Sequence, residues 1–277
     1  MTDSIEELEV FANKIRKGCL DMALSAGKGG CHVGGGFSCI EIFAVLFGRI
    51  LRVDATNSTD ANRDRFIASK AHCILPHFTT LALKGFADPD TLLSFHDDAG
   101  FFAGHPWRVE NGLEFSGGSL GMGLSLGIGM ALAAKRQSMT YRTYVLLGDG
   151  ESNEGAVWEA FMSAAHFKLD NLVVIVDFNN MQFDGPCSEI MGMEPLGARL
   201  KAFGWETRRV SGHDIGALSE AFAAPHPGKP LAIVADTVKA RGIPGLENKA
   251  ESHHAVLTQE MYDAVVRDME GGVYGRL

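Results

Sequence analysis

Cysteine is scarce in this chain of 277 residues, and its pattern is as informative as its number. No two cysteines form a Cys-x-x-Cys pair, and the count is odd, with the residues at positions 19, 31, 39, 73 and 187. Both features argue against a disulfide framework and against a zinc site of clustered cysteines. They predict free thiols and a cytoplasmic location, where the environment is reducing.

Positive charge is also in short supply. The chain carries 25 lysines and arginines against 34 aspartates and glutamates, which gives a formal net charge of −9. An acidic chain gains no long-range attraction to nucleic acid or to an anionic membrane, so neither is an expected partner. An anionic ligand would have to be held by local groups or by a metal ion.

Leader segments, membrane spans and nucleotide-binding motifs are not evident either. The first ten residues, MTDSIEELEV, have no basic and apolar leader pattern. The longest apolar stretch, residues 120–134, contains four glycines and is too short to span a bilayer. No G-x-x-x-x-G-K-[ST] sequence occurs, and Gly121-x-Gly123 does not continue as G-x-G-x-x-G, so nucleotide binding is a remote possibility.

Short apolar runs alternate with helical patterns along the chain. The runs at 142–147, 171–177 and 231–238 are typical of buried strands, and 204–210 is a further strand candidate. This alternation predicts one α/β domain over residues 1–277, with a mostly parallel central sheet and helices on both faces. We also expect a helix over 4–25 with a capping box from Asp3 and Glu6, a glycine-rich break at 27–37, and a small-residue helix over 120–135.

Polar residues follow two of these apolar runs. Asp149 lies between Gly148 and Gly150 after the first run, and Asn179 with Asn180 follows the second. The carboxyl ends of neighbouring parallel strands meet at one edge of a sheet, where ligands bind. A carboxylate, an amide oxygen and a backbone carbonyl suit magnesium or calcium, not zinc, and the glycines would let a phosphate approach the backbone. Each motif alone is an ordinary turn, but together they predict a magnesium–diphosphate site.

The same two motifs carry a resemblance to a known family. GDG followed about thirty residues later by NN resembles the thiamine-diphosphate-binding motif. The surrounding sequence is similar to the transketolase family, specifically the N-terminal chain of its two-chain members. The resemblance runs nearly end to end, through GCHVGGGFSCIEIFAVLF, RDRFIASKAH, AGHP, GLEFSGGSLGMGLSLGIGMALAAK, GDGESNEG, VDFNNMQFDG, SGHD and SHHAVLT.

The resemblance implies roles for individual residues. Thiamine diphosphate and Mg²⁺ (or Ca²⁺ or Mn²⁺) are the implied cofactors, with Asp149, Asn179 and the carbonyl of Met181 as metal ligands. The implied catalytic residues are His32, His72, His105 and His253. The implied cofactor-binding residues are Gly148, Asp149, Gly150, Glu154, Asn179, His72, Ser119, Leu120 and His253, with Glu154 near the contact between two cofactor sites.

The resemblance also implies an activity and a partner. Members of the family transfer a two-carbon ketol unit from a ketose to an aldehyde, and a glutamate from a second, pyrimidine-binding domain activates the cofactor. No stretch of this chain matches that domain or the C-terminal one, so both are expected on a separate partner chain in an α2β2 assembly. The glycine-rich segment 120–135 is expected to pack closely at such a contact.

Four positions depart from the family pattern, and two other functions stay open. Val33 replaces a usual proline, Trp107 a small acidic residue, Met122 a glutamine and His254 a glycine. These changes favour a specialised ketose, leave its identity and phosphorylation open, and leave open whether His253 or His254 is functional. The alternatives are a subunit of a thiamine-diphosphate enzyme acting on a 2-oxo acid, and a non-catalytic subunit that stabilises its partner.

Overall fold

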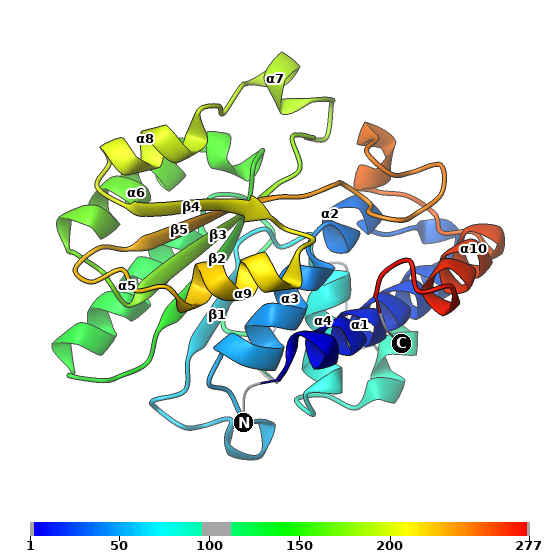
Figure 1. Cartoon of the computed structure of the whole chain (residues 1–277), viewed down its shortest axis with the longest axis horizontal. Coiled ribbons are helices and arrows are strands. Elements are labelled where there is room, and N and C mark those ends of the chain that lie inside the picture. The colour runs from blue at the N-terminus through cyan, green and yellow to red at the C-terminus, as the bar shows by residue number, and fades with distance from the viewer. Residues whose placement is uncertain (1–2, 96–111, 276–277) are drawn as a thin grey trace.

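Five parallel strands form the centre of the molecule (Figure 1). The structure is a computed structural model, and it describes residues 3–95 and 112–275. The strands stand in the order β1-β2-β3-β5-β4, and each neighbouring pair is parallel. Their bounds are β1 Arg65–Ala68, β2 Thr143–Gly148, β3 Leu172–Phe178, β4 Glu206–Ser211 and β5 Leu231–Asp236. The predicted parallel α/β sheet is therefore confirmed.

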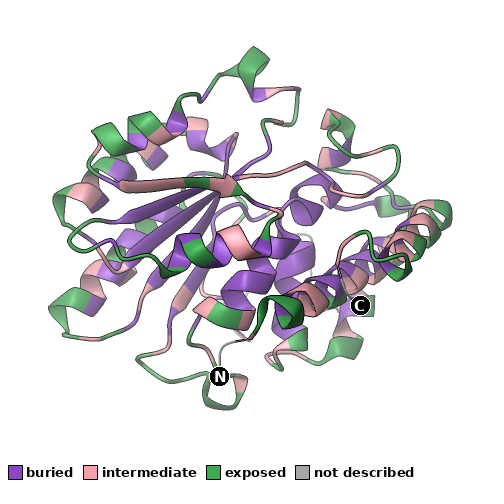
Figure 2. Ribbon diagram, viewed as in Figure 1, coloured by how far each residue is buried: buried purple, intermediate pink, exposed green. Residues whose placement is uncertain are grey.

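Helices cover both faces of this sheet, as predicted. Successive residues of β3 alternate between two cores: Val173 and Ile175 belong to one, and Val174 and Val176 to the other. The first core includes α1 (Ile5–Ser25), α3 (Ile40–Val45), α4 (Ile74–Leu83), α9 (Ile215–Ala223) and α10 (Gln259–Glu270). The second includes α5 (Gly123–Arg136), α6 (Gly155–His166) and α8 (Leu196–Ala202). The central strands are consequently buried on both faces (Figure 2).

Shorter elements join these helices and strands. They are α2 (Val33–Phe37), α7 (Cys187–Ile190), a π-helical turn at Leu46–Ile50, and 3₁₀ turns at Gly27–Gly29, Ala55–Asn57, Pro89–Ser94, Glu151–Asn153 and Ala250–His253. Among the helices of the described ranges, none combines the length and the apolar character that a membrane crossing requires.

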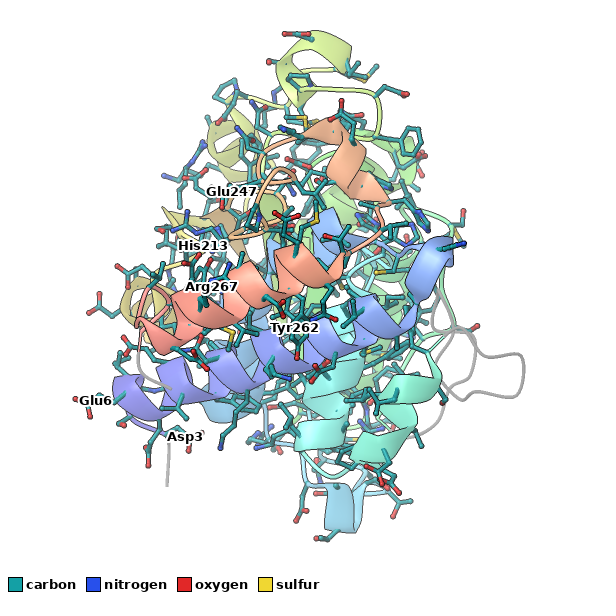
Figure 3. All side chains as sticks on the ribbon, turned by 90° about the vertical axis from the view of Figure 1, so that its right-hand side faces the viewer. Asp3, Glu6, His213, Glu247, Tyr262 and Arg267 are labelled. Carbon is teal, nitrogen blue, oxygen red and sulfur yellow. The ribbon has the colours of Figure 1, made fainter. Side chains whose placement is uncertain are left out.

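The two ends of the described chain pack together. α10 lies along α1 (Figure 3), where the Tyr262 hydroxyl donates to Asp21 Oδ1 at 2.8 Å. The capping box expected from Asp3 and Glu6 was wrong by one residue. Ser4 Oγ accepts from Glu7 N at 3.2 Å, and Ser4 N donates to Glu7 Oε2 at 2.6 Å, so the reciprocal pair begins one position later.

The glycine-rich segments are used mainly for close packing. The expected break at 27–37 was wrong in part, because its second half forms α2, where a Cβ on Gly34 would lie 2.6 Å from Ser252 Oγ. On α5, a Cβ on Gly127 would lie 2.6 Å from Val145 Cγ2, whereas among the described residues a Cβ on Gly129 would have no such neighbour within 4 Å. Gly127 thus serves contact between α5 and its own sheet.

Candidate active site

The two polar motifs meet at the carboxyl edge of the sheet. Strand pairing sets Gly148 opposite Asp177, and Asp149 and Asn179 follow directly after the ends of β2 and β3. Asp149 is 3% exposed and Asn179 is 8% exposed. Because neighbouring parallel strands end together, two residues thirty positions apart in sequence lie side by side.

Backbone N–H groups hold the oxygen atoms of these residues in place. Asp149 accepts from Gly150 N at 2.7 Å and from Asn180 N at 2.5 Å, while Asn179 Oδ1 accepts from Met181 N at 3.0 Å. Asn180 adopts a φ of 57°, a left-handed conformation that asparagine tolerates better than most residues. The turn wraps the chain around the Asp149 carboxylate, so its position is fixed by the main chain.

A cavity of about 260 Å³ opens above this turn. Nine of the residues named from sequence line it: His72, Leu120, Gly148, Asp149, Gly150, Glu154, Asn179, Met181 and His253. Of the remaining named residues, His32 contacts two rings of the lining, Ser119 is exposed and outside the lining, and His105 lies outside the described residues.

The donor set fits a hard cation. In the described ranges, no group of three or more His, Cys, Asp or Glu side chains is placed to hold a metal ion, so a cysteine- or histidine-rich centre has no support there. Burial, with the nearby Asp177 charge, raises the pKa of Asp149 to about 6. A cation beside this buried carboxylate would offset that unfavourable charge, and oxygen donors are those that magnesium and calcium prefer.

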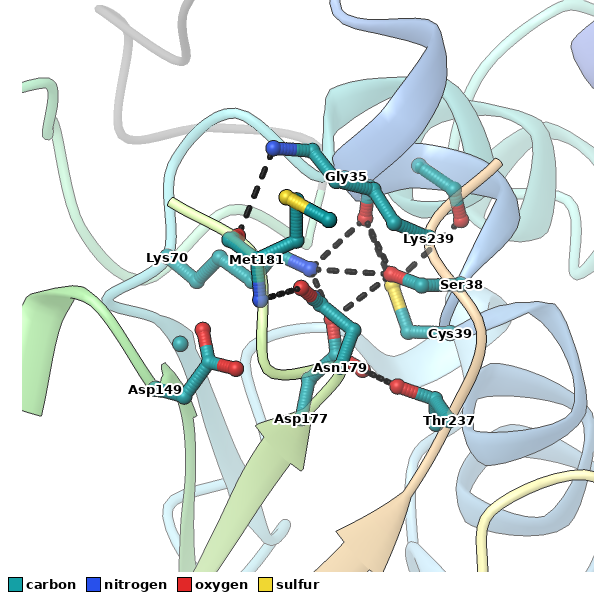
Figure 4. A network of polar contacts seen from close by, with 12 residues as sticks. Gly35, Ser38, Cys39, Lys70, Asp149, Asp177, Asn179, Met181, Thr237 and Lys239 are labelled. Atoms are coloured by element: carbon teal, nitrogen blue, oxygen red, sulfur yellow. Dashed lines mark hydrogen bonds and ion pairs between the residues drawn. The ribbon is translucent and has the colours of Figure 1, made fainter. Parts of the chain in front are cut away.

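A buried ion pair lies beneath the turn (Figure 4). Lys70 Nζ pairs with Asp177 Oδ2, and Lys70 also donates to Gly35 O at 2.8 Å and to Ser38 Oγ at 3.1 Å. Burial, the largest single influence, lowers the pKa of Lys70, but the Asp177 charge, its hydrogen bond and the nearby thiols together outweigh burial and raise that pKa. Asp177 accepts from Asn179 Nδ2 at 3.2 Å, which directs the other atom of that amide, Oδ1, to the turn.

Lys239 is a second buried cation at the cavity, and its partners are carbonyls. Its Nζ donates to Gln182 O at 2.8 Å and to Met181 O at 3.3 Å. No ion pair to a carboxylate is found for it within the described part of the chain. Burial and the Lys70 charge lower the pKa of Lys239 to about 8. A buried ammonium without a carboxylate partner is suited to an anionic ligand.

The carboxylate of Glu151 connects three chain segments beside the cavity through hydrogen bonds. Its Oε1 accepts from Ser69 Oγ at 2.5 Å and from Gly121 N at 2.9 Å, and its Oε2 accepts from Gly148 N at 3.1 Å. Burial raises the pKa of Glu151, although these hydrogen bonds act in the opposite direction. Glu154, by contrast, is exposed at the start of α6, where a Cβ on Gly121 would lie 2.9 Å from its Cβ.

Sequence reasoning did not identify Lys70, Asp177, Glu151 or Lys239. The available signal was a charged residue inside or directly after an apolar run, as in NLVVIVD, RFIASK and LAIVADTVK. Lysine and aspartate are almost never fully buried unless they are paired, so charges in such runs point to a paired or ligand-binding role.

The strand-end oxygens form one wall of the cavity, and imidazole rings form a second wall. The centroid of His32 lies 5.9 Å from that of His72, 5.4 Å from that of His253 and 5.1 Å from that of His254. His72 and His253 are 5.1 Å apart, and the exposed Phe183 lies 5.0 Å from His253. Three separate segments therefore bring together His32, His72 and His253 of the four histidines predicted to be catalytic.

Two of these imidazoles, His72 and His253, have lowered pKa values that favour their uncharged form. Burial, then the Lys70 charge, lowers the pKa of His72 well below its usual value. Burial and the charges of Lys239 and Lys70 lower the pKa of His253 to about 4. A neutral imidazole offers one donor and one acceptor nitrogen, so these rings can hydrogen-bond hydroxyl groups and accept protons from them.

The histidines left without a functional role in the sequence analysis lie elsewhere, except His96, which is outside the described residues. His77 is buried among aromatic rings, and its pKa falls to about 3 through burial. His213 lies 2.9 Å from Glu41 through Nδ1 and accepts from Val238 N at 2.8 Å through Nε2. His226 lies 2.9 Å from Lys229 O, and His166 is exposed on α6.

The structure places three of the four unusual residues, and Trp107 lies outside the described residues. Val33 is buried at the start of α2, and Met122 is 56% exposed just before α5. His253 lines the cavity, whereas His254 is exposed and packs against His32. Of the two neighbouring histidines, His253 is thus the one at the cavity.

Together, the parallel sheet, the strand-end oxygens and the buried lysines define an α/β domain whose cavity is suited to an anionic ligand and a hard metal ion. The family model "Transketolase, thiamine diphosphate binding domain" matches residues 8–270. The chain therefore belongs to the thiamine-diphosphate-binding domain family of transketolases, as its motifs predicted.

Two kinds of relative are similar to this chain. A protein of Phocaeicola vulgatus named as one subunit of apulose-4-phosphate transketolase is 37% identical, over 96% of this chain and 94% of that protein. The 6-deoxy-6-sulfo-D-fructose transketolase subunit SqwG of Clostridium sp. is also 37% identical, over 98% of each. The crystal structure of Campylobacter jejuni transketolase superposes with a TM-score of 0.89 at 31% identity, over 97% of this chain and 43% of that one.

These relatives differ in length. The chain spans nearly the whole of the two subunits, but only 41% and 43% of the transketolases from Leishmania mexicana and Campylobacter jejuni.

Proposed function

We propose that this chain is the diphosphate- and metal-binding subunit of a transketolase-like enzyme made of two different chains. The enzyme transfers a two-carbon ketol unit from a ketose to an aldehyde. The observation that carries the proposal is the joint placement of the strand-end oxygens, Lys239 and the neutral imidazoles around one cavity. The end-to-end match to two proteins named as transketolase subunits supports the two-chain form.

Each wall of the cavity has its own task in this proposal. Asp149, Asn179 and the Met181 carbonyl hold Mg²⁺ (or Ca²⁺ or Mn²⁺), and Lys239 faces the diphosphate of thiamine diphosphate. The bound cofactor supplies a thiazolium ring that can accept the electrons of a broken carbon–carbon bond. His32, His72 and His253 bind the hydroxyl groups of the sugar and take or return their protons.

The partner chain completes the enzyme. We propose that it carries the pyrimidine-binding domain with the activating glutamate, and that the two chains form an α2β2 assembly. Leu120, Met122 and Leu126 are exposed apolar side chains on and just before α5, near the cavity, and they fit burial against such a partner.

A reconstitution experiment tests this function. The chain is purified alone and with the product of a neighbouring reading frame that encodes a pyrimidine-binding domain. Both samples receive Mg²⁺, thiamine diphosphate, an aldose acceptor and one of several ketose donors: apulose 4-phosphate, 6-deoxy-6-sulfofructose, xylulose 5-phosphate or fructose 6-phosphate. The expected result is two-carbon transfer from at least one donor, and only with both chains present.

Two outcomes support the alternatives. In a parallel sample that receives pyruvate in place of the ketose, release of CO₂, with no transfer from any ketose in the other samples, would favour an enzyme acting on 2-oxo acids. A complex that shows no Mg²⁺-dependent binding of thiamine diphosphate by calorimetry would favour a non-catalytic, stabilising subunit.

A further inference from the structure

A short backbone bridge fixes which histidine lies against His32. Cys31 N donates to Ala255 O at 3.0 Å, and Ala255 N donates to Cys31 O at 2.9 Å, which makes an isolated antiparallel pair. In an antiparallel pair, the residues one step further along lie directly opposite each other. Here these residues are His32 and His254, and their rings meet edge to face at 5.1 Å and 89°.

The preceding residue, His253, faces the cavity. His253 is the last residue of the 3₁₀ turn at Ala250–His253, and it lines the cavity, where it contacts His72 and Phe183. A shift of this bridge by one residue would place His253, in place of His254, opposite His32. The bridge therefore assigns His253 to the cavity and His254 to the side of the His32 ring.

Gly30 provides the room for this arrangement. Its φ is 66°, and a Cβ at this position would lie 2.8 Å from Ala255 O and 3.3 Å from His254 Cε1. Any other residue at position 30 would press on the bridge and on the His254 ring. The contact between His32 and His254 thus depends on a local backbone conformation that favours glycine.

We propose that His254 is a positioning residue for His32, whose ring orientation it restricts by packing edge-on against it. His32 also contacts His72 and His253, so its orientation decides which nitrogen atoms face the cavity. A glycine at position 254, as in the family pattern, would leave that side of the ring without this support. The inference rests on the proposed function, in which His32 binds sugar hydroxyls.

The test compares four substitutions in the full chain. His254→Phe keeps a ring edge, whereas His254→Gln keeps only polarity, and His254→Ala and His254→Gly keep neither. His166→Ala is the matched control, since His166 is also exposed and also lies edge-on to a neighbouring ring, that of Phe167 at 5.0 Å. Thermal unfolding checks that all five variants are folded.

The first readout is the nuclear magnetic resonance signal of the His32 ring, assigned by its loss in His32→Gln. We expect the Gly, Ala and Gln variants of His254 to shift and broaden this signal, and the Phe variant and the His166 control to preserve it. An unchanged His32 signal in His254→Gly, or a Gln variant that preserves it as well as Phe does, would overturn the proposal.

The second readout is turnover by the two-chain complex with the ketose donor that the reconstitution experiment selects. We expect kcat to fall about two- to tenfold in His254→Gly, the range for an aromatic pair, with rescue by His254→Phe and unchanged affinity for thiamine diphosphate. Because the spectroscopic readout needs no substrate, it remains decisive if ketol transfer itself is not observed.

Discussion

The two walls of the cavity are built in different ways. The oxygen wall comes from two adjacent strand ends, and backbone N–H groups fix the carboxylate of Asp149 and the amide of Asn179. The imidazole wall comes from three distant segments: the start of α2, the segment after β1 and the turn at Ala250–His253. Side-chain packing holds this second wall, together with the single bridge between Cys31 and Ala255.

The walls also differ in charge, and this difference separates binding from chemistry. Lys239 lies at the cavity beside the oxygen wall and the Lys70–Asp177 pair lies beneath the turn, so positive charge that suits a diphosphate is placed next to oxygens that suit a metal ion. The rings of His72 and His253 are kept neutral by burial and by those same lysines, which suits proton exchange with hydroxyl groups. The charges that bind the cofactor thus also set the protonation state of the residues that face the sugar.

The largest expected effect comes from breaking the oxygen wall. Asp149→Ala removes the charged metal ligand, and the Mg²⁺-dependent affinity for thiamine diphosphate should fall by more than about 100-fold, since even outer-shell partners are worth up to about that factor. Isothermal titration calorimetry measures this loss, and circular dichroism checks that the chain remains folded.

The control for this change is Asp184→Ala, because Asp184 is an exposed aspartate in the loop that carries Asn179 and Met181. Its affinity for the cofactor should match that of the unchanged chain. Full affinity in Asp149→Ala would show that the metal ligands have been misassigned.

The next-largest effect concerns the buried ion pair of Lys70 and Asp177, which lies beneath the turn of the oxygen wall. Lys70→Met leaves the buried Asp177 carboxylate without its cation, and the free energy of unfolding should fall by about 3–5 kcal/mol. Urea denaturation measures it. Lys135→Met is the matched control, because it breaks an ion pair with Asp170 whose side chains are 38% and 39% exposed, and it should cost at most about 1 kcal/mol. Equal losses in both variants would contradict a special role for the buried pair.

The smallest effect is a pH dependence of the free energy of unfolding, which arises from His253 in the imidazole wall. The pKa of His253 is about 4 in the folded chain and about 6.5 in the unfolded chain, so the unfolded chain binds the proton first as the pH falls. The contribution of this residue to stability is therefore complete above pH 6.5 and is lost progressively as the pH falls towards 4. His253→Asn should remove this part of the acid sensitivity.

Urea denaturation of both proteins at a series of pH values tests this. The difference between their free energies of unfolding should be constant above pH 6.5 and should change between pH 6.5 and 4. A His253 ring that titrates near 6.5 in nuclear magnetic resonance spectra would show that burial does not hold it neutral.

Local patterns predicted the sheet and one wall of the site. The apolar runs that became β2, β3 and β5 carry their own strand signal, and Asp149 and Asn179 follow those runs directly, so their meeting needed only that the strands be neighbours. The partners of Lys70 and Lys239 had no such signal, because each lies on another segment far along the chain. The start of α1 was misplaced because serine and aspartate both favour the cap position, and only the hydrogen bonds choose between them.

The sequence by itself determined the α/β class, the family and the identity of the strand-end oxygens, because these depend on residue type and on spacing along one strand or turn. Only the tertiary structure decided that Lys70 neutralises Asp177, that His253 and not its neighbour faces the cavity, and that His254 rests on His32. These contacts depend on how distant segments pack and on the register of a single backbone bridge, and neither is encoded in any local pattern of residues.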